Sequence, residues 1–255
     1  MLCLLGPLLL GADFGWAPWL FAVMAAGLLM LALLWPLERR IERRRNGLPL
    51  IHLALLQDRS FAIGLLVVFF FTFANISFYL VLTLYMQLGL GFTPLQSGTT
   101  MLPSAIAFAI VSRMAGPRAQ RRGVSALIEG CGVQIAGLAA LGAAIAVFPP
   151  PEPSQLAFLL VIFGAGQAMV MAPLYGIVLT KVPTAHAGSG GGVLSTVQQV
   201  GNASGVAVIG ALFYAVLASD SARYAFLACV STLAVAIAIT AGFLHVLSPV
   251  RPQES

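Results

Sequence analysis

The sequence predicts an all-α membrane protein, and three observations lead to that prediction. Of its 255 residues, 60% are hydrophobic and only 8% are charged, whereas soluble domains carry about 25% charged residues. Between Arg59 and Arg113, 53 consecutive residues have no charge, and about 20 apolar residues cross a hydrocarbon core roughly 30 Å thick. The apolar runs show no period-two alternation, so the spans are expected to be helices rather than the strands of a barrel.

The basic residues gather in alternate loops. If successive loops lie on opposite sides, twelve of the 13 basic residues share one side and only Arg223 lies on the other. Cytoplasmic loops carry the excess of Lys and Arg, so we expect a multi-pass protein of the cell membrane with loop 113–122 and the C-terminus in the cytoplasm, and loop 149–153 outside. The net charge of +5 then orients the protein and meets anionic lipid headgroups, and a nucleic-acid partner is not expected.

Residues 1–58 form a first region before the main group of spans. Its expected parts are a helix remnant, a linker transmembrane helix and a basic cytoplasmic linker, at residues 1–11, 17–36 and 38–56. The 11-residue segment is too short to span, so we expect the end of a helix whose beginning is absent, with a short interfacial segment as the alternative. Trp16, Trp19 and Trp35 flank the full span, as is typical at membrane interfaces.

Residues 59–255 contain six further spans separated by Gly- and Pro-rich breaks. We expect these spans at residues 61–87, 96–112, 124–148, 155–180, 189–217 and 224–247. Pro94 with Ser97 and Gly98 joins the first pair of spans, and Pro183 with Ala187 and Gly188 joins the fourth and fifth, with the two glycines 90 residues apart. This spacing indicates two sets of three helices, and inverted repeats of that kind are typical of transporters.

Polar side chains form stripes on otherwise apolar helices. Spacings of three and four residues place them on one helical face in each of two spans, and a third span adds two more. The candidates for a solute pathway are Thr72, Asn75, Tyr79, Thr83, Gln167, Tyr175, Ser195, Gln198, Gln199 and Asn202. Hydrogen bonding between helices and a polar pathway for solute both account for such groups in a membrane. Beside the second stripe, Gly201 and Gly205 predict close contact with a neighbouring helix.

Glu129 is the acidic residue expected inside a span. A carboxylate in hydrocarbon costs roughly 2.5–3.5 kcal/mol on insertion scales, and such residues often bind protons or cations. Glu129 is therefore a candidate for proton coupling. It also lies six residues after Gly123, so pairing with Arg121 or Arg122 is the structural alternative.

The sequence contains no readable constellation for catalysis, metal or cofactor binding. Three cysteines and three histidines lack the spacing of a disulfide framework or a metal site. A Ser204–His245 pair would suit an intramembrane protease, but Ser204 lies in the middle of a long helix with no helix-start oxyanion site. We therefore expect neither an enzyme nor a bound cofactor.

Residues 116–123 resemble the loop motif of the major facilitator superfamily. Gly116, Arg121 and Gly123 match its pattern of glycine, arginine and glycine with further basic residues, whereas Gln120 stands where an acidic residue is usual. Two longer segments, residues 50–64 and 173–210, are similar to the 14-helix drug:proton antiporter branch of that superfamily.

The resemblance implies that the last six spans form the C-terminal six-helix half-bundle of a major facilitator fold. It also implies a part in proton-coupled efflux of amphipathic organic compounds or drugs. The expected partners are the lipid bilayer, such a solute, protons, and the missing N-terminal half or a second copy, because the main proton-coupling acids of this family lie in the N-terminal half. A non-transporting membrane scaffold or partner subunit derived from half a transporter is the alternative.

Overall fold

The computed structural model describes residues 58–147, 152–180, 182 and 187–247. The chain divides into two compact units, Met1–His52 and Leu53–Ser255, and the described residues belong to the second unit. The expected helix remnant, linker helix and basic linker lie outside the described residues. The domain boundary near residue 58 therefore stays a prediction.

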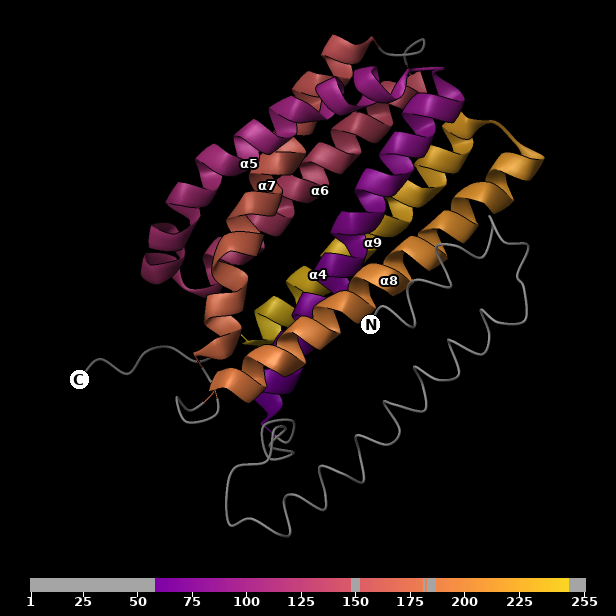
Figure 1. Ribbon diagram of the computed structural model, residues 1–255. Coiled ribbons are helices and arrows are strands. Elements are labelled where there is room, and N and C mark those ends of the chain that lie inside the picture. Colours follow the sequence, from indigo (N-terminus) through magenta and orange to yellow (C-terminus); the bar gives the residue numbers. More distant parts are fainter. Residues whose placement is uncertain (1–57, 148–151, 181, 183–186, 248–255) are drawn as a thin grey trace, which may run out of the picture. The chain divides into compact units, whose positions relative to one another are not determined.

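Six long helices make up the described part of the chain (Figure 1). They are α4 (Arg59–Leu84), continued by the π-helical turn η1 (Tyr85–Gly89), α5 (Pro94–Arg122), α6 (Val124–Val147), α7 (Pro153–Leu179), α8 (Ala187–Ser219) and α9 (Ala222–Leu247). Each of the six is long and apolar enough to cross a membrane. This confirms the prediction of an all-α, six-helix membrane bundle.

Side-chain caps fix the beginnings of α4 and α5. The Asp58 carboxylate accepts hydrogen bonds from the backbone N–H groups of Ser60 and Phe61, at 2.7 and 3.1 Å. At α5, the Thr93 hydroxyl accepts from the backbone N–H of Gln96 at 3.2 Å, and the Gln96 side chain accepts from the backbone N–H of Thr93 at 2.9 Å. Such reciprocal capping satisfies N–H groups that have no partner within the helix.

The second span is longer than the sequence predicts. We expected it to end at residue 112 and residues 116–123 to form a loop, but α5 stays helical through Arg122 and turns only at Gly123. Pro103 and Pro117 lie inside α5, because a membrane helix tolerates a proline when neighbouring groups satisfy the freed backbone. Gly123 has a φ of 59°, which glycine adopts without strain.

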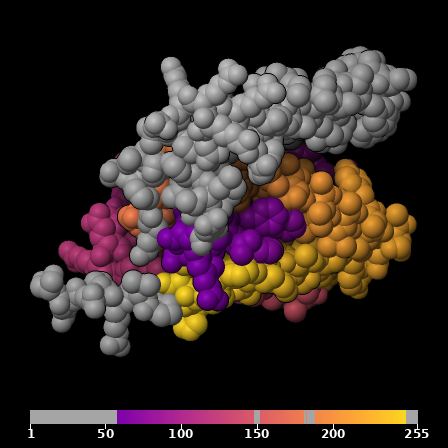
Figure 2. Space-filling model, turned by 90° about the horizontal axis from the view of Figure 1, so that it is seen from below, coloured from indigo at the N-terminus to yellow at the C-terminus, as the bar shows by residue number. Residues whose placement is uncertain are grey.

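Contacts between helices repeat in the two sets of three. Helix α5 of the first set, α4 to α6, packs on α7 of the second set, and its counterpart α8 of the second set packs on α4 of the first. Likewise α6 packs on α7 and α9 on α4, while α6 and α9 contact each other (Figure 1). The neighbouring surfaces of α8 and α9 are visible in Figure 2. This packing agrees with the two sets of three that the spacing indicates.

Helix α5 has small residues inside and large apolar residues outside. Its buried positions are Ser97, Thr100, Ser104, Ala107, Ala115 and Ala119. Its exposed large side chains are Leu95, Leu102, Ile106, Ile110 and Met114. Because soluble proteins rarely expose so continuous an apolar surface, this arrangement suits a helix whose outer face contacts lipid.

Candidate functional site

The polar stripe of α4 consists of Thr72, Asn75, Tyr79 and Thr83. The hydroxyls of its two threonines form hydrogen bonds within their own helix. Thr72 is buried and donates to the Val68 carbonyl at 2.8 Å, and Thr83 donates to the Tyr79 carbonyl at 2.7 Å. Thr72 also lies 3.4 Å from the Gln198 carbonyl of α8. Both hydroxyls are therefore satisfied inside the bundle, and Thr72 also contacts α8.

Asn75 is bonded between helices rather than open to a pathway. Its Nδ2 donates to the Phe71 carbonyl at 2.7 Å, and its Oδ1 accepts from Gln134 Nε2 of α6 at 2.6 Å. Gly166 of α7 makes this possible, since a Cβ there would lie 2.5 Å from the Gln134 backbone nitrogen. The interhelical alternative therefore describes Asn75. The sequence analysis did not single out Gln134. Like Gln167, however, Gln134 is an amide residue within an apolar span.

The half-buried Tyr79 joins three helices through a polar cluster with the buried Gln167 and Ser104. Its hydroxyl donates to Gln167 Oε1 of α7 at 2.8 Å and lies 3.5 Å from Ser104 Oγ of α5. Farther along α7, the buried hydroxyl oxygen of Tyr175 has no hydrogen-bond partner among the described residues. The sequence identified Tyr79, Gln167 and Tyr175 but not Ser104, which is one of several hydroxyl residues in its span.

The polar stripe of α8 differs from that of α4 because its side chains have no hydrogen-bond partner among the described residues. Ser195 and Gln199 are exposed, and Gln198 and Asn202 are half-buried. Within the described ranges, none of these four side chains makes a hydrogen bond to protein. Their donors and acceptors are therefore available to water or to a solute.

Two glycines bring α8 against α4, as their spacing predicts. A Cβ at Gly205 would lie 2.5 Å from both the Phe73 carbonyl oxygen and Ser77 Oγ, and a Cβ at Gly201 would collide with Thr72 Oγ1. Glycine at both positions therefore permits the close contact between α8 and α4.

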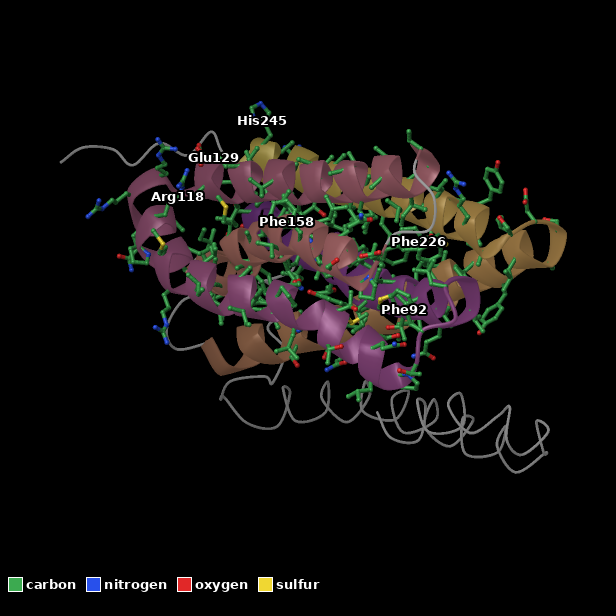
Figure 3. All side chains as sticks on the ribbon, turned by 90° about the horizontal axis from the view of Figure 1, so that it is seen from above. Phe92, Arg118, Glu129, Phe158, Phe226 and His245 are labelled. Atoms are coloured by element: carbon green, nitrogen blue, oxygen red, sulfur yellow. The ribbon has the colours of Figure 1, made fainter. Side chains whose placement is uncertain are left out.

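Glu129 is held by two arginines at the turn between α5 and α6. Arg118 and Arg122 approach its two carboxylate oxygens at 2.5 and 2.6 Å, and Figure 3 shows Arg118 beside Glu129. Pairing with Arg122 was expected, and Arg118 is an additional partner. Of the loop-motif residues, Arg121 is exposed and Gly123 forms the turn, whereas Gly116 lies within α5. The pair ties the ends of two consecutive helices together.

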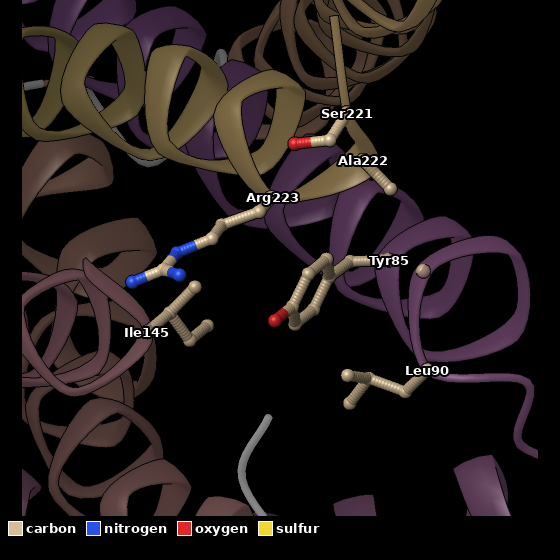
Figure 4. Close-up of a pocket in the computed structure, with 7 residues that line it drawn as sticks. Tyr85, Leu90, Ile145, Ser221, Ala222 and Arg223 are labelled. Carbon is tan, nitrogen blue, oxygen red and sulfur yellow. The ribbon is translucent and has the colours of Figure 1, made fainter. Parts of the chain in front are cut away.

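A small cavity at the opposite end of the bundle lies away from these polar stripes. It measures about 140 Å³ and is lined by Tyr85, Gly89, Leu90, Ile145, Ser221, Ala222 and Arg223 (Figure 4). Arg223 donates to the Ala146 carbonyl in the last turn of α6, where a cation is favoured by the helix dipole. Arg223 thus has a structural role at this end.

Comparison with known proteins shows the family to which the chain belongs. A model of the Major Facilitator Superfamily matches residues 2–206 of the chain. The chain belongs to the major facilitator superfamily.

Its relatives in the superfamily include drug and antibiotic transporters. A "Probable actinorhodin transporter" of Streptomyces coelicolor is 33% identical over 225 residues, which are 86% of this chain and 38% of that protein. A "Multidrug resistance protein Stp" of Mycobacterium tuberculosis is 31% identical over 179 residues, 69% of this chain and 32% of the relative. A "Drug efflux pump JefA" of the same species is 30% identical over 197 residues, which are 75% of this chain and 37% of that protein.

These matches support the drug:proton antiporter-like branch of the major facilitator superfamily. The chain spans less than two fifths of the length of these relatives. It is a multi-pass membrane protein of a transporter family, and it is not an enzyme. Among the described residues, no group of His, Cys, Asp and Glu is suited to hold a metal ion.

Proposed function

We propose that this chain acts as the C-terminal six-helix half of an efflux transporter that exchanges protons for amphipathic organic compounds. The observation that carries the proposal is the contrast between the two polar stripes. The α4 side chains are bonded within the bundle, whereas the side chains of Ser195, Gln198, Gln199 and Asn202 on α8 make no hydrogen bond among the described residues.

The proposed solute pathway follows α8 and includes the polar cluster of Tyr79, Gln167 and Ser104. Polar groups left against lipid would lack hydrogen bonds, so the α8 stripe is expected to face a wetted cavity. Tyr79 and Gln167 contribute a hydroxyl and an amide, and Tyr175 contributes a hydroxyl that has no hydrogen-bond partner among the described residues. An amphipathic solute suits such a pathway because the amides of α8 are combined with the aromatic rings of Tyr79 and Tyr175.

Proton coupling in this proposal depends on acidic residues outside the six described helices. Glu129 is engaged by Arg118 and Arg122 at the helix ends, away from the α8 stripe. We assign it to the α5–α6 turn rather than to proton transfer. We also propose that the arginine-rich end and the C-terminus face the cytoplasm, from the distribution of basic residues.

The test compares the chain alone with a chimera. Alternating access rocks one half of such a transporter against the other, so the chain expressed alone in a pump-deficient host should leave sensitivity to cationic dyes unchanged. Fused behind the N-terminal part of the Streptomyces coelicolor relative, it should restore export that an uncoupler abolishes. Export by the chain alone would contradict the half-transporter assignment, and an inert chimera that inserts normally would favour a scaffold.

Two variants of the chimera test the pathway. Gln198→Leu should alter the range of exported compounds without changing thermal stability, because its side chain makes no protein hydrogen bond within the described ranges. Asn75→Leu should lower thermal stability and keep the substrate range, because it breaks the bond to Gln134. The reverse pattern would place the pathway on α4 instead.

A further inference from the structure

The cavity shown in Figure 4 is lined by residues of the η1 turn, α6 and the start of α9. Apart from Gly89, three of its lining residues are polar and three have apolar side chains: Tyr85, Ser221 and Arg223, and Leu90, Ile145 and Ala222. At about 140 Å³ and roughly 30 Å³ per water molecule, the cavity has room for about five waters or one small organic ion. It is separate from the α8 stripe, so its role does not depend on the proposed function.

Tyr85 is a buried residue whose hydroxyl has no hydrogen-bond partner within the described ranges. Only 3% of the residue is exposed, and the hydroxyl lines the cavity without a bond to any described group. Figure 4 shows it on the side of the ring that points toward Ile145 and Arg223. The ring packs on Phe226, with centroids 4.7 Å apart. Because a buried hydroxyl without a partner is unfavourable, a ligand that bonds to it would stabilise this end of the bundle.

Arg223 brings a positive charge to the same cavity. Its guanidinium donates to the Ala146 carbonyl, which leaves other members of its fork of five N–H donors free. The carboxylate of Asp220 accepts from the backbone N–H of Ser221 at 2.8 Å, and no acidic group of the described residues lies within ion-pair distance of Arg223. Arg223 is half-buried, and a charge that is partly removed from water is stabilised by an opposite charge.

The start of α9 adds to the positive potential. The backbone N–H of Ala225 is the first in this helix to bond to a backbone carbonyl, that of Ser221 at 3.1 Å. The N–H groups of Ala222, Arg223 and Tyr224 precede it and have no partner within the helix, and no described side chain bonds to them. Free N–H groups at a helix N-terminus favour an anion.

We propose that this cavity binds one small organic anion, with its carboxylate at Arg223 and Tyr85 and a short alkyl group against Leu90 and Ile145. A single cation matches a monovalent anion, and the guanidinium fork suits the two oxygens of a carboxylate. The apolar lining favours an alkyl carboxylate over inorganic phosphate, because phosphate would place polar oxygens against Leu90 and Ile145 without hydrogen bonds. The ligand class is therefore a short-chain monocarboxylate, and propionate is a suitable probe.

The experiment measures binding of propionate to the purified full chain in detergent. Saturation-transfer NMR follows the methyl protons of propionate, with protein-free micelles as the blank and propanol as a neutral analogue. We expect saturable binding of propionate and none of propanol. Tyr85→Phe should weaken propionate binding about tenfold, the loss of one hydrogen bond to a charged group, since the ring and its contact with Phe226 are kept. Arg223→Gln should abolish the binding.

Tyr224→Phe is the matched control, because Tyr224 is exposed and does not line the cavity; it should leave the affinity for propionate unchanged. No saturable binding of propionate, binding that survives Arg223→Gln, or equal losses in the two tyrosine variants would overturn the site. Displacement of propionate by inorganic phosphate at equal concentration would overturn the assignment to a carboxylate. Displacement by phosphatidylglycerol added to the micelles would assign the cavity to a lipid headgroup instead.

Discussion

Replacing Gly205 by alanine tests the packing of α8 on α4. The new Cβ would lie 2.5 Å from the Phe73 carbonyl oxygen, and ordinary contact begins at 3.4 Å, so α8 must retreat by about 0.9 Å at this point. Overpacking of this kind costs about 1–3 kcal/mol. Gly192→Ala is a matched control on the same helix, since a Cβ there meets nothing within 4 Å.

Both variants gain about 0.5–1 kcal/mol of helix propensity, so the difference between them isolates the overpacking. At about 2–4 °C per kcal/mol, Gly192→Ala should unfold at a slightly higher temperature than the parent and Gly205→Ala several degrees below the control. Cys131 and Cys229 are fully buried, so a thiol-reactive dye reports unfolding in a Cys3→Ser background. Equal unfolding temperatures in the two variants would refute the close approach of α8 to α4.

Three further outcomes follow from the structure. Gln134→Leu should lower stability by about 0.6–1.7 kcal/mol, the range for hydrogen bonds between membrane helices, measured with the same dye assay; an unchanged unfolding temperature would show that its bond to Asn75 contributes nothing. Glu129→Gln should lower the unfolding temperature slightly in low salt and not in high salt, because exposed ion pairs are screened; a loss of equal size in both salts would contradict this. Single cysteines at Gln120 and Ser154, both exposed, should react with an impermeant reagent from opposite sides of intact cells, with Ser154→Cys accessible from outside; labelling of Gln120→Cys alone would invert the orientation.

The sequence was sufficient to predict the spans because the physics that determines them is local. A run of 20 apolar residues has few alternatives to a membrane helix, and Gly201 and Gly205 predicted a contact that the structure confirms. The end of α5 was mispredicted because Gly116 and Pro117 are residue types that are common in loops. The helix nevertheless continues through them, since neighbouring groups satisfy the backbone that Pro117 leaves unpaired.

The roles of the polar stripes could not be predicted from one helix at a time. Periodicity places Asn75 and Gln198 on helical faces with equal certainty, but it does not say which neighbour each face meets. Asn75 meets Gln134, 59 positions away, whereas Gln198 meets no side-chain partner among the described residues. The close packing of α6 on α7 at Gly166 is what holds Gln134 beside Asn75. The pattern of a single helix does not contain this information.

The small inner face of α5 has a consequence for movement. Serine, threonine and alanine leave only shallow ridges on the face of α5 that meets α7, so we expect few large side chains of α5 to oppose a small shift along α7. Sliding of packed helices by an ångström or two is the shear type of conformational change. Transport requires a bundle that holds together in the membrane and still changes shape. A contact between α5 and α7 that is made of small side chains would allow both.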